Sequence, residues 1–206
     1  MALKIMSAAT ALTVIALAAR QLPREFESRT IYPLLAKPVS RTAFLLGKLL
    51  GILLAAVFCF ALFMSVFVAG SLYLGARIPW ALFLQFIYLQ ILMMLVLATL
   101  CFWFSMFMNL DATVTLGVIF YATSTLLTTA STYLYYFVGR AGQIVLTALV
   151  YIIPQLSLFD LSGKATHSSI WAPLGIRPLV ELTLYGGFYA ALFFFFALIL
   201  FRRRAL

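Results

Sequence analysis

The sequence predicts an all-α integral membrane protein, on the basis of its composition and of the way its apolar residues are arranged. Of the 206 residues, 66% are hydrophobic and only 9% are charged, whereas soluble domains usually contain about 25% charged residues. The apolar residues form continuous runs, which differ from the alternating pattern of membrane β-strands. Because only helices and closed barrels satisfy their backbone hydrogen bonds in lipid, the runs are predicted to be transmembrane helices.

Five of the apolar runs are long enough to cross a bilayer, which requires about 20 helical residues. A sixth run, residues 144–159, is the shortest and is interrupted by Pro154. Little length remains for a soluble domain, so residues 1–206 are predicted to form a single transmembrane domain. The five spans are predicted at about residues 2–19, 42–74, 80–108, 112–137 and 179–201.

The charge distribution predicts the side of the membrane on which each loop lies. The formal net charge is +9, and in membrane proteins Lys and Arg collect on the cytoplasmic side. Six basic residues lie between Arg20 and Lys48, and Arg202 to Arg204 are near the end of the chain. If both segments are cytoplasmic, an even number of crossings must separate them. Residues 144–159 are therefore predicted to form a re-entrant segment at the outer face, and the basic composition is explained without nucleic-acid binding.

The predicted cytoplasmic segment of residues 20–41 has features of two short helical pieces, separated at Pro33, ahead of a long helix. Pro23 suits the first position of a short helix, and Glu25 and Glu27 suit its first turn, where the helix dipole favours anions. The next helix could extend from Arg41 to Leu74, about 50 Å, which exceeds the ~30 Å hydrocarbon core. Its basic start is therefore expected to stand in the cytoplasm or among the lipid headgroups, where a motor protein could push on it.

Four stretches of the sequence are similar to one known family. They are Glu27-Ser-Arg-Thr30, then Leu34-Leu35-Ala-Lys37-Pro38-Val39-Ser40-Arg41, then Leu46-Gly47-Lys48-Leu-Leu-Gly51, and Ile153-Pro154-Gln-Leu-Ser-Leu-Phe159-Asp160 ahead of the last span. They resemble the type-2 ABC transporter permeases, and the closest group is the one linked to copper-enzyme maturation and gliding motility. The resemblance covers nearly the whole chain.

This resemblance implies the membrane-spanning permease of an ATP-binding cassette exporter in the bacterial cytoplasmic (inner) membrane. It implies six spans, of which this chain would lack the first, and a re-entrant region before the last span. It also implies two permeases, paired as a homo- or heterodimer, that work with two ATPase subunits. Residues 20–41 would carry the coupling helix that docks on the ATPase. The candidate contact residues are Glu25, Phe26, Glu27, Arg29, Thr30, Leu34, Leu35, Pro38 and Arg41.

No ATP-binding motif is present in the sequence. The pattern Gly-x-x-x-x-Gly-Lys-Ser/Thr is absent, so ATP hydrolysis is expected on a separate chain and the subunit is not expected to be an enzyme. No cofactor or metal is expected, because His167 is the only histidine and zinc sites use three or four protein ligands. The expected partners are an ABC ATPase that binds ATP, a second permease and membrane lipid, but not nucleic acid.

Two alternative functions would require chemistry inside the membrane. An intramembrane enzyme needs paired acids, a His–Glu pair or a metal cluster, and an ion-coupled secondary carrier needs buried Asp, Glu or His. The acidic residues of this chain lie at the edges of the apolar runs, which disfavours both alternatives.

Two patterns indicate sites for helix contacts and for substrate. Gly47, Gly51 and Ala55 recur every four residues, as in membrane helices that approach closely. We interpret them as packing within the subunit in preference to an interface between subunits. The run of residues 112–137 is rich in hydroxyl groups, which either line a polar path or bond back to their own helix. The candidate substrate-path residues are Thr125, Thr128, Ser131 and Thr132.

Overall fold

The computed structural model describes residues 2–27, 41–75, 78–166 and 172–203. Over these residues the chain is helical, without a β-strand, so the predicted all-α fold is confirmed. The elements are α1 (Ala2–Glu27), α3 (Arg41–Tyr73), α4 (Trp80–Phe104), α5 (Leu110–Leu134), α6 (Arg140–Ile152), the 3-10 helix η1 (Leu156–Phe159), α7 (Ser162–Thr166) and α8 (Ile176–Arg203).

Five helices in the described part of the chain are long and apolar enough to cross a membrane, as predicted. They are α1, α3, α4, α5 and α8, and their candidate spans are Ala2–Gln21, Thr42–Tyr73, Trp80–Phe104, Leu110–Leu127 and Ile176–Arg203. Residues 144–159 do not form a sixth. They comprise most of α6, an irregular link and η1, because Pro154 cannot continue a helix with normal hydrogen bonds.

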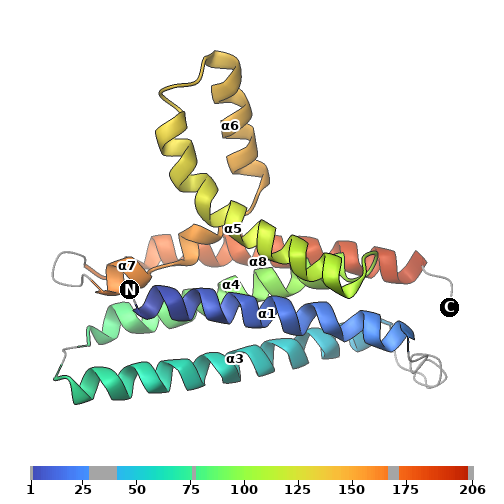
Figure 1. Cartoon of the computed structure of the whole chain (residues 1–206), viewed down its shortest axis with the longest axis horizontal. Coiled ribbons are helices and arrows are strands. Elements are labelled where there is room, and N and C mark those ends of the chain that lie inside the picture. The colour runs from blue at the N-terminus through green and yellow to red at the C-terminus, as the bar shows by residue number, and fades with distance from the viewer. Residues whose placement is uncertain (1, 28–40, 76–77, 167–171, 204–206) are drawn as a thin grey trace.

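The core of the bundle is built around α4, which contacts α8, α1, α3 and α5. Its sequence is apolar on every side, as expected of a helix surrounded by other helices. Phe86, Leu89 and Met94 are fully buried, and so is Ile15 of α1. The four helices α1, α3, α4 and α8 run along the long axis of the molecule (Figure 1).

The two ends of the bundle differ in what they contain. The end of α1, the start of α3 and the end of α8 lie together at what we call the C-terminal end (Figure 1). The start of α1, α7, the end of α3 and the start of α4 lie at the opposite, N-terminal end. The basic residues Arg20, Lys48, Arg202 and Arg203 are therefore carried by helix segments at the same end, the arrangement expected of the cytoplasmic face.

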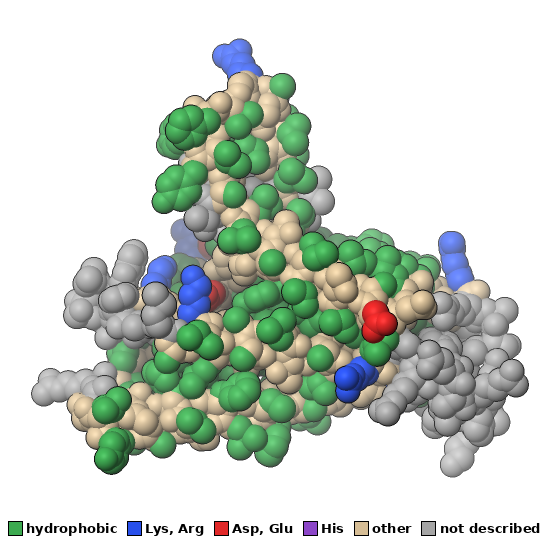
Figure 2. Space-filling model, viewed as in Figure 1, with side chains coloured by type: hydrophobic (Ala, Val, Ile, Leu, Met, Phe, Trp, Pro, Cys, Tyr) green, Lys and Arg blue, Asp and Glu red, His purple; other side chains and the backbone are tan. Residues whose placement is uncertain are grey.

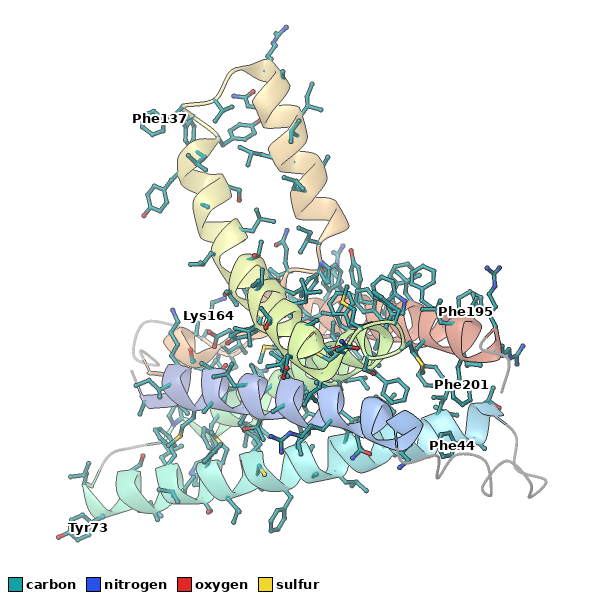
Figure 3. All side chains as sticks on the ribbon, turned by 45° about the vertical axis from the view of Figure 1, so that its right-hand side comes forward. Phe44, Tyr73, Phe137, Lys164, Phe195 and Phe201 are labelled. Carbon is teal, nitrogen blue, oxygen red and sulfur yellow. The ribbon has the colours of Figure 1, made fainter. Side chains whose placement is uncertain are left out.

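The second half of α5 and the whole of α6 form an arm, residues 126–152, that stands away from the bundle (Figures 1 and 3). The first half of α5 packs against α1 and α4, whereas α6 packs mainly against α5. Phe137, at the turn between the two helices, is 87% exposed. The arm therefore presents apolar side chains that the rest of the described chain does not cover.

The prediction that Pro23 begins a separate short helix is wrong. Instead, α1 continues through Pro23 and ends at Glu27. A proline inside a helix removes the hydrogen bond of its own nitrogen and crowds the carbonyl four residues earlier. Pro23 lies in the last two turns of α1, so only the end of the helix is affected. By contrast, α3 begins at Arg41 as predicted, and its 33 residues correspond to about 50 Å.

Candidate functional site

The predicted coupling segment, residues 20–41, begins within α1 and ends at the first residue of α3. Glu25, Phe26 and Glu27 form the last turn of α1, and Arg41 is the first residue of α3. The structure thus describes the two helices that flank the segment, both at the C-terminal end of the bundle (Figure 1). The other candidate contact residues lie outside the described residues, namely Arg29, Thr30, Leu34, Leu35 and Pro38.

An aromatic contact that the sequence did not reveal anchors the start of α3 to the end of α8. The rings of Phe44 and Phe201 stack with their centroids 6.1 Å apart, where the two helices meet (Figure 3). Lys48 Nζ lies 5.7 Å from the centroid of the Phe44 ring, which is within cation–π range. Phe201 and the neighbouring Leu45 are fully buried. A displacement of α3 near Arg41 would therefore act directly on α8.

The small-residue stripe of α3 does not pack against another described helix of the same chain. A Cβ added to Gly47 or Gly51 would meet no atom within 4 Å, and Ala55 is exposed. This geometry does not support packing within the subunit, the interpretation that the sequence favoured. Spacing alone cannot tell which neighbour a stripe faces, because the same pattern serves both kinds of contact.

Among the candidate substrate-path residues, Thr125 bonds to the backbone of its own helix. Its hydroxyl donates to the carbonyls of Tyr121 and Ala122, at 3.0 Å each, which is back-bonding within α5. Ser131 is half-buried in the arm, and the side chains of Thr128 and Thr132 lie outside the described set. A substrate path along α5 stays a prediction.

Ser124, which the sequence did not single out from its hydroxyl neighbours, connects α5 to the segment after α6. Its buried hydroxyl donates to the carbonyl of Pro154 and accepts a 2.8 Å hydrogen bond from the Leu156 amide. Irregular backbone at membrane depth is tolerated only where protein satisfies its polar groups. Ser124 therefore fixes the link through which the chain returns from the arm to the bundle.

Two more side chains hold the connection between the arm and α8. The Tyr185 hydroxyl of α8 accepts a 2.9 Å hydrogen bond from the Gln155 amide. The Gln85 side chain of α4 donates to the Leu174 carbonyl and accepts from the Leu174 amide, both at 2.9 Å. This connection is thus attached to α4, α5 and α8 by side-chain hydrogen bonds, and rearrangement of those helices would move it.

A buried polar contact joins α1 to α4. Gln90 is fully buried, and its Nε2 donates to the Thr10 hydroxyl at 3.0 Å, while the Ser7 hydroxyl donates to its Oε1 at 3.2 Å. Such side-chain bonds link membrane helices, with a contribution of about 0.6 kcal/mol on average. An amide residue within an apolar run was the sequence signal for both Gln85 and Gln90.

The chemistry of the described residues is that of packing and hydrogen bonding. Within the described ranges, no group of three or more His, Cys, Asp or Glu side chains could hold a metal ion. Asp111 and Glu181 are exposed, and Glu181 forms a 3.0 Å ion pair with Arg177 on the surface of α8. The contacts described above join helices to one another and to the connection between the arm and α8. We therefore interpret their role as mechanical.

Comparison with known proteins assigns this arrangement to a family. The family model described as ABC-2 family transporter protein matches residues 2–206, which is nearly the whole chain. No curated protein matches the sequence, and no solved structure matches it either.

Proposed function

Because the chain belongs to the ABC-2 family of transporter proteins, we propose that it is the permease of an ABC exporter driven by a separate ATPase through residues 20–41. Family membership makes the chain a multi-pass membrane permease of an ABC transporter, and therefore a transport subunit instead of an enzyme. The direction of transport, the ATPase contact, the pairing of permeases and a bacterial inner-membrane location are the parts we propose. The resemblance to the copper-enzyme and gliding-motility group supports export.

The observation that carries the coupling proposal is the attachment of both flanking helices to the core. On one side of the segment, α3 is anchored to α8 by the stacked rings of Phe44 and Phe201. On the other side, α1 packs against α4 and α5, and Gln90 joins it to α4. A force applied between Glu27 and Arg41 would consequently reach three helices of the bundle at once.

A force applied between Glu27 and Arg41 would be transmitted through the bundle to the connection between the arm and α8. Ser124, Tyr185 and Gln85 hold that connection from three helices. We infer that movement of α1 and α3 shifts α5 and α8 and opens the bundle at its N-terminal end, which the positive-inside rule assigns to the outer face. Substrate would pass beside α5, the helix that carries the candidate path residues Thr125, Thr128, Ser131 and Thr132.

The proposal includes a second permease that packs against α3. The exposed stripe of Gly47, Gly51 and Ala55 would let a second helix approach closely. In a chain with Cys59 and Cys101 replaced by alanine, Gly51→Cys is expected to form a disulfide between copies under mild oxidation. Leu50→Cys, which is turned by about 100° on the same helix, should not. Crosslinking through Leu50→Cys alone would place the interface elsewhere.

The coupling proposal is tested by co-purification with the cognate ATPase. A Glu27→Lys, Leu34→Ala, Leu35→Ala triple variant should weaken the complex about tenfold or more, because charged and apolar contacts at an interface centre dominate its affinity. Stimulation of ATP hydrolysis by the permease in proteoliposomes should fall in parallel. The membrane insertion of the variant should be unchanged.

The matched control places the same kinds of substitution at the other end of the bundle. Glu181→Lys, Leu72→Ala and Leu74→Ala together alter exposed residues and should leave both ATPase binding and stimulation intact. If the coupling variant binds and stimulates like the unaltered protein, residues 20–41 are not the coupling segment. If no ATPase associates with the unaltered permease, the chain does not work as an ATPase-driven subunit.

A further inference from the structure

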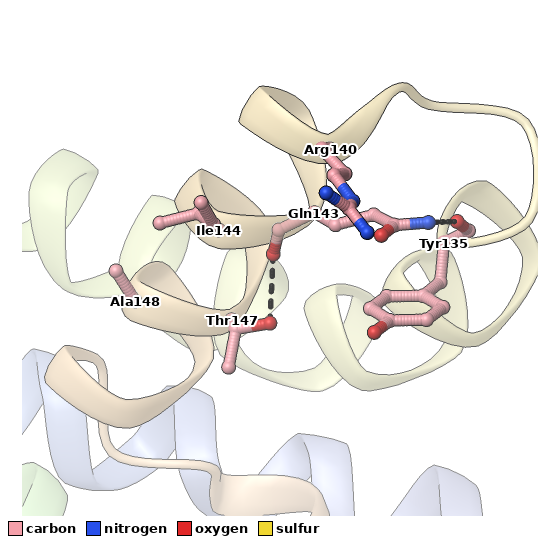
Figure 4. A pocket seen from close by; sticks show the side chains of 6 residues that line it. All are labelled: Tyr135, Arg140, Gln143, Ile144, Thr147 and Ala148. Atoms are coloured by element: carbon pink, nitrogen blue, oxygen red, sulfur yellow. Dashed lines mark hydrogen bonds between the residues drawn. The ribbon is translucent and has the colours of Figure 1, made fainter.

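The tip of the arm contains a hollow that the transport proposal does not use. It lies between Tyr135, the residue that follows α5, and the first turns of α6 and has a volume of about 560 Å³, within the range of about 300–1,000 Å³ found for ligand sites. The lining residues, drawn in Figure 4, are Tyr135, Arg140, Gln143, Ile144, Thr147 and Ala148.

The hollow is polar at one end and apolar along one wall. Arg140, Ile144 and Ala148 follow at four-residue spacing, so they share one face of α6. The Gln143 Nε2 donates a 3.0 Å hydrogen bond to the Tyr135 carbonyl and so ties α6 to the end of α5 (Figure 4). A ligand that fits this lining has a polar head and an apolar tail.

The charge of the site is that of a single cation. Arg140 is the only charged residue in the sequence of residues 126–152, and its side chain has no ion-pair partner within the part of the chain that the structure describes. Figure 2 shows a basic side chain at the far end of the arm, with hydrophobic side chains below it. A guanidinium on an apolar arm in a membrane is costly unless an anion accompanies it.

We propose that this hollow binds one phospholipid with an anionic headgroup. The phosphate would accept hydrogen bonds from the Arg140 guanidinium, whose planar donors match phosphate oxygens in bidentate geometry. One acyl chain would lie against Ile144 and Ala148, and the exposed Val145 and Leu149 would meet the lipid around it. This site depends on the arm alone and is independent of the coupling proposal.

Native mass spectrometry of the delipidated protein in a neutral detergent tests the site. With phosphatidylglycerol and phosphatidylcholine of the same acyl chains, we expect one phosphatidylglycerol to be retained and to bind more tightly. Arg140→Gln should weaken phosphatidylglycerol binding about tenfold or more, since the substitution removes charge-assisted hydrogen bonds. Arg140→Lys should lie between the two, because lysine keeps the charge but loses the bidentate geometry. Arg177→Gln, which alters an exposed arginine of α8, is the matched control and should bind like the unaltered protein.

A second variant tests the apolar wall with the cation in place. Ala148→Trp should fill the hollow and lower phosphatidylglycerol binding while Arg140 remains. Arg140 and Ala148 are both exposed, so the elution volume and thermal stability of each variant should stay unchanged. Equal retention of the two lipids, or unaltered binding by Arg140→Gln, would overturn the proposal. Displacement of the lipid by millimolar inorganic phosphate would also overturn it, since the site would then recognise a small anion without an acyl chain.

Discussion

The bundle around α4 and the arm formed by α5 and α6 are both rich in apolar residues, yet the chain covers them very differently. In the bundle, Phe86 and Phe102 are fully buried. In the arm, Tyr136 is 86% exposed, Phe137 is 87% exposed and Ile144 is 70% exposed. The same kind of side chain thus contributes to the stability of the subunit in one region and to its outer surface in the other.

This difference in burial shows that apolar composition in a membrane protein does not distinguish core from surface. Lipid is as apolar as a leucine side chain, so close packing and interhelical hydrogen bonds decide which helices associate. The bundle has both, as Gly117 and Gln90 show. The arm has few contacts with the rest of the chain, so its surface is available to lipid or to another subunit. Three substitutions test this comparison.

The largest effect is expected where α5 meets the bundle. A Cβ at Gly117 would lie 2.8 Å from Ile15 Cγ2 and 2.9 Å from Cys101 Sγ. Gly117→Val should therefore separate α5 from α1 and α4 and reduce the free energy of unfolding by about 3 kcal/mol, the upper end for overpacked cores. Unfolding in mixed micelles with increasing SDS would measure it.

The control for this substitution is Gly187→Val on α8. A Cβ at Gly187 meets no atom within 4 Å, so the free energy of unfolding should change by less than ~1 kcal/mol. Equal losses for the two variants would show that the effect at Gly117 does not come from the contact of α5 with α1 and α4.

A smaller effect is expected at the junction between the two regions. Ser124→Ala leaves the Pro154 carbonyl and the Leu156 amide without their hydroxyl partner, which should cost about 1–2 kcal/mol for buried polar groups. Hydrogen exchange of the Leu156 amide should become faster. The control is Ser65→Ala, because the Ser65 hydroxyl is exposed and bonds only to its own helix. Unchanged exchange at Leu156 would mean that Ser124 does not fix this link.

The smallest effect is expected at the tip of the arm. Phe137→Ala should change the free energy of unfolding of the monomer by less than ~0.5 kcal/mol, as for other exposed positions. Phe86→Ala, at a fully buried position of α4, should instead cost about 3–5 kcal/mol. A loss above ~1 kcal/mol for Phe137→Ala in neutral micelles would contradict the description of the arm as a surface.

Sequence alone was sufficient for the helical class, for five membrane-crossing helices and for the start of α3 at Arg41. These features follow from local properties. A continuous apolar run in lipid must form a helix, because no other open structure satisfies its backbone groups, and a basic cluster marks where a run ends. The family resemblance also came from local stretches, such as the one from Leu34 to Arg41.

Contacts between distant residues were decided only in the tertiary structure. The stacking of Phe44 on Phe201 and the hydrogen bonds of Gln85 to Leu174 join residues far apart in sequence, and no local pattern specifies such partners. The stripe at Gly47 and Gly51 had the spacing of a packed face, yet it is turned away from the other described helices. Periodicity defines a face of a helix, whereas the rotation of that helix in the bundle is determined by how all the helices pack together.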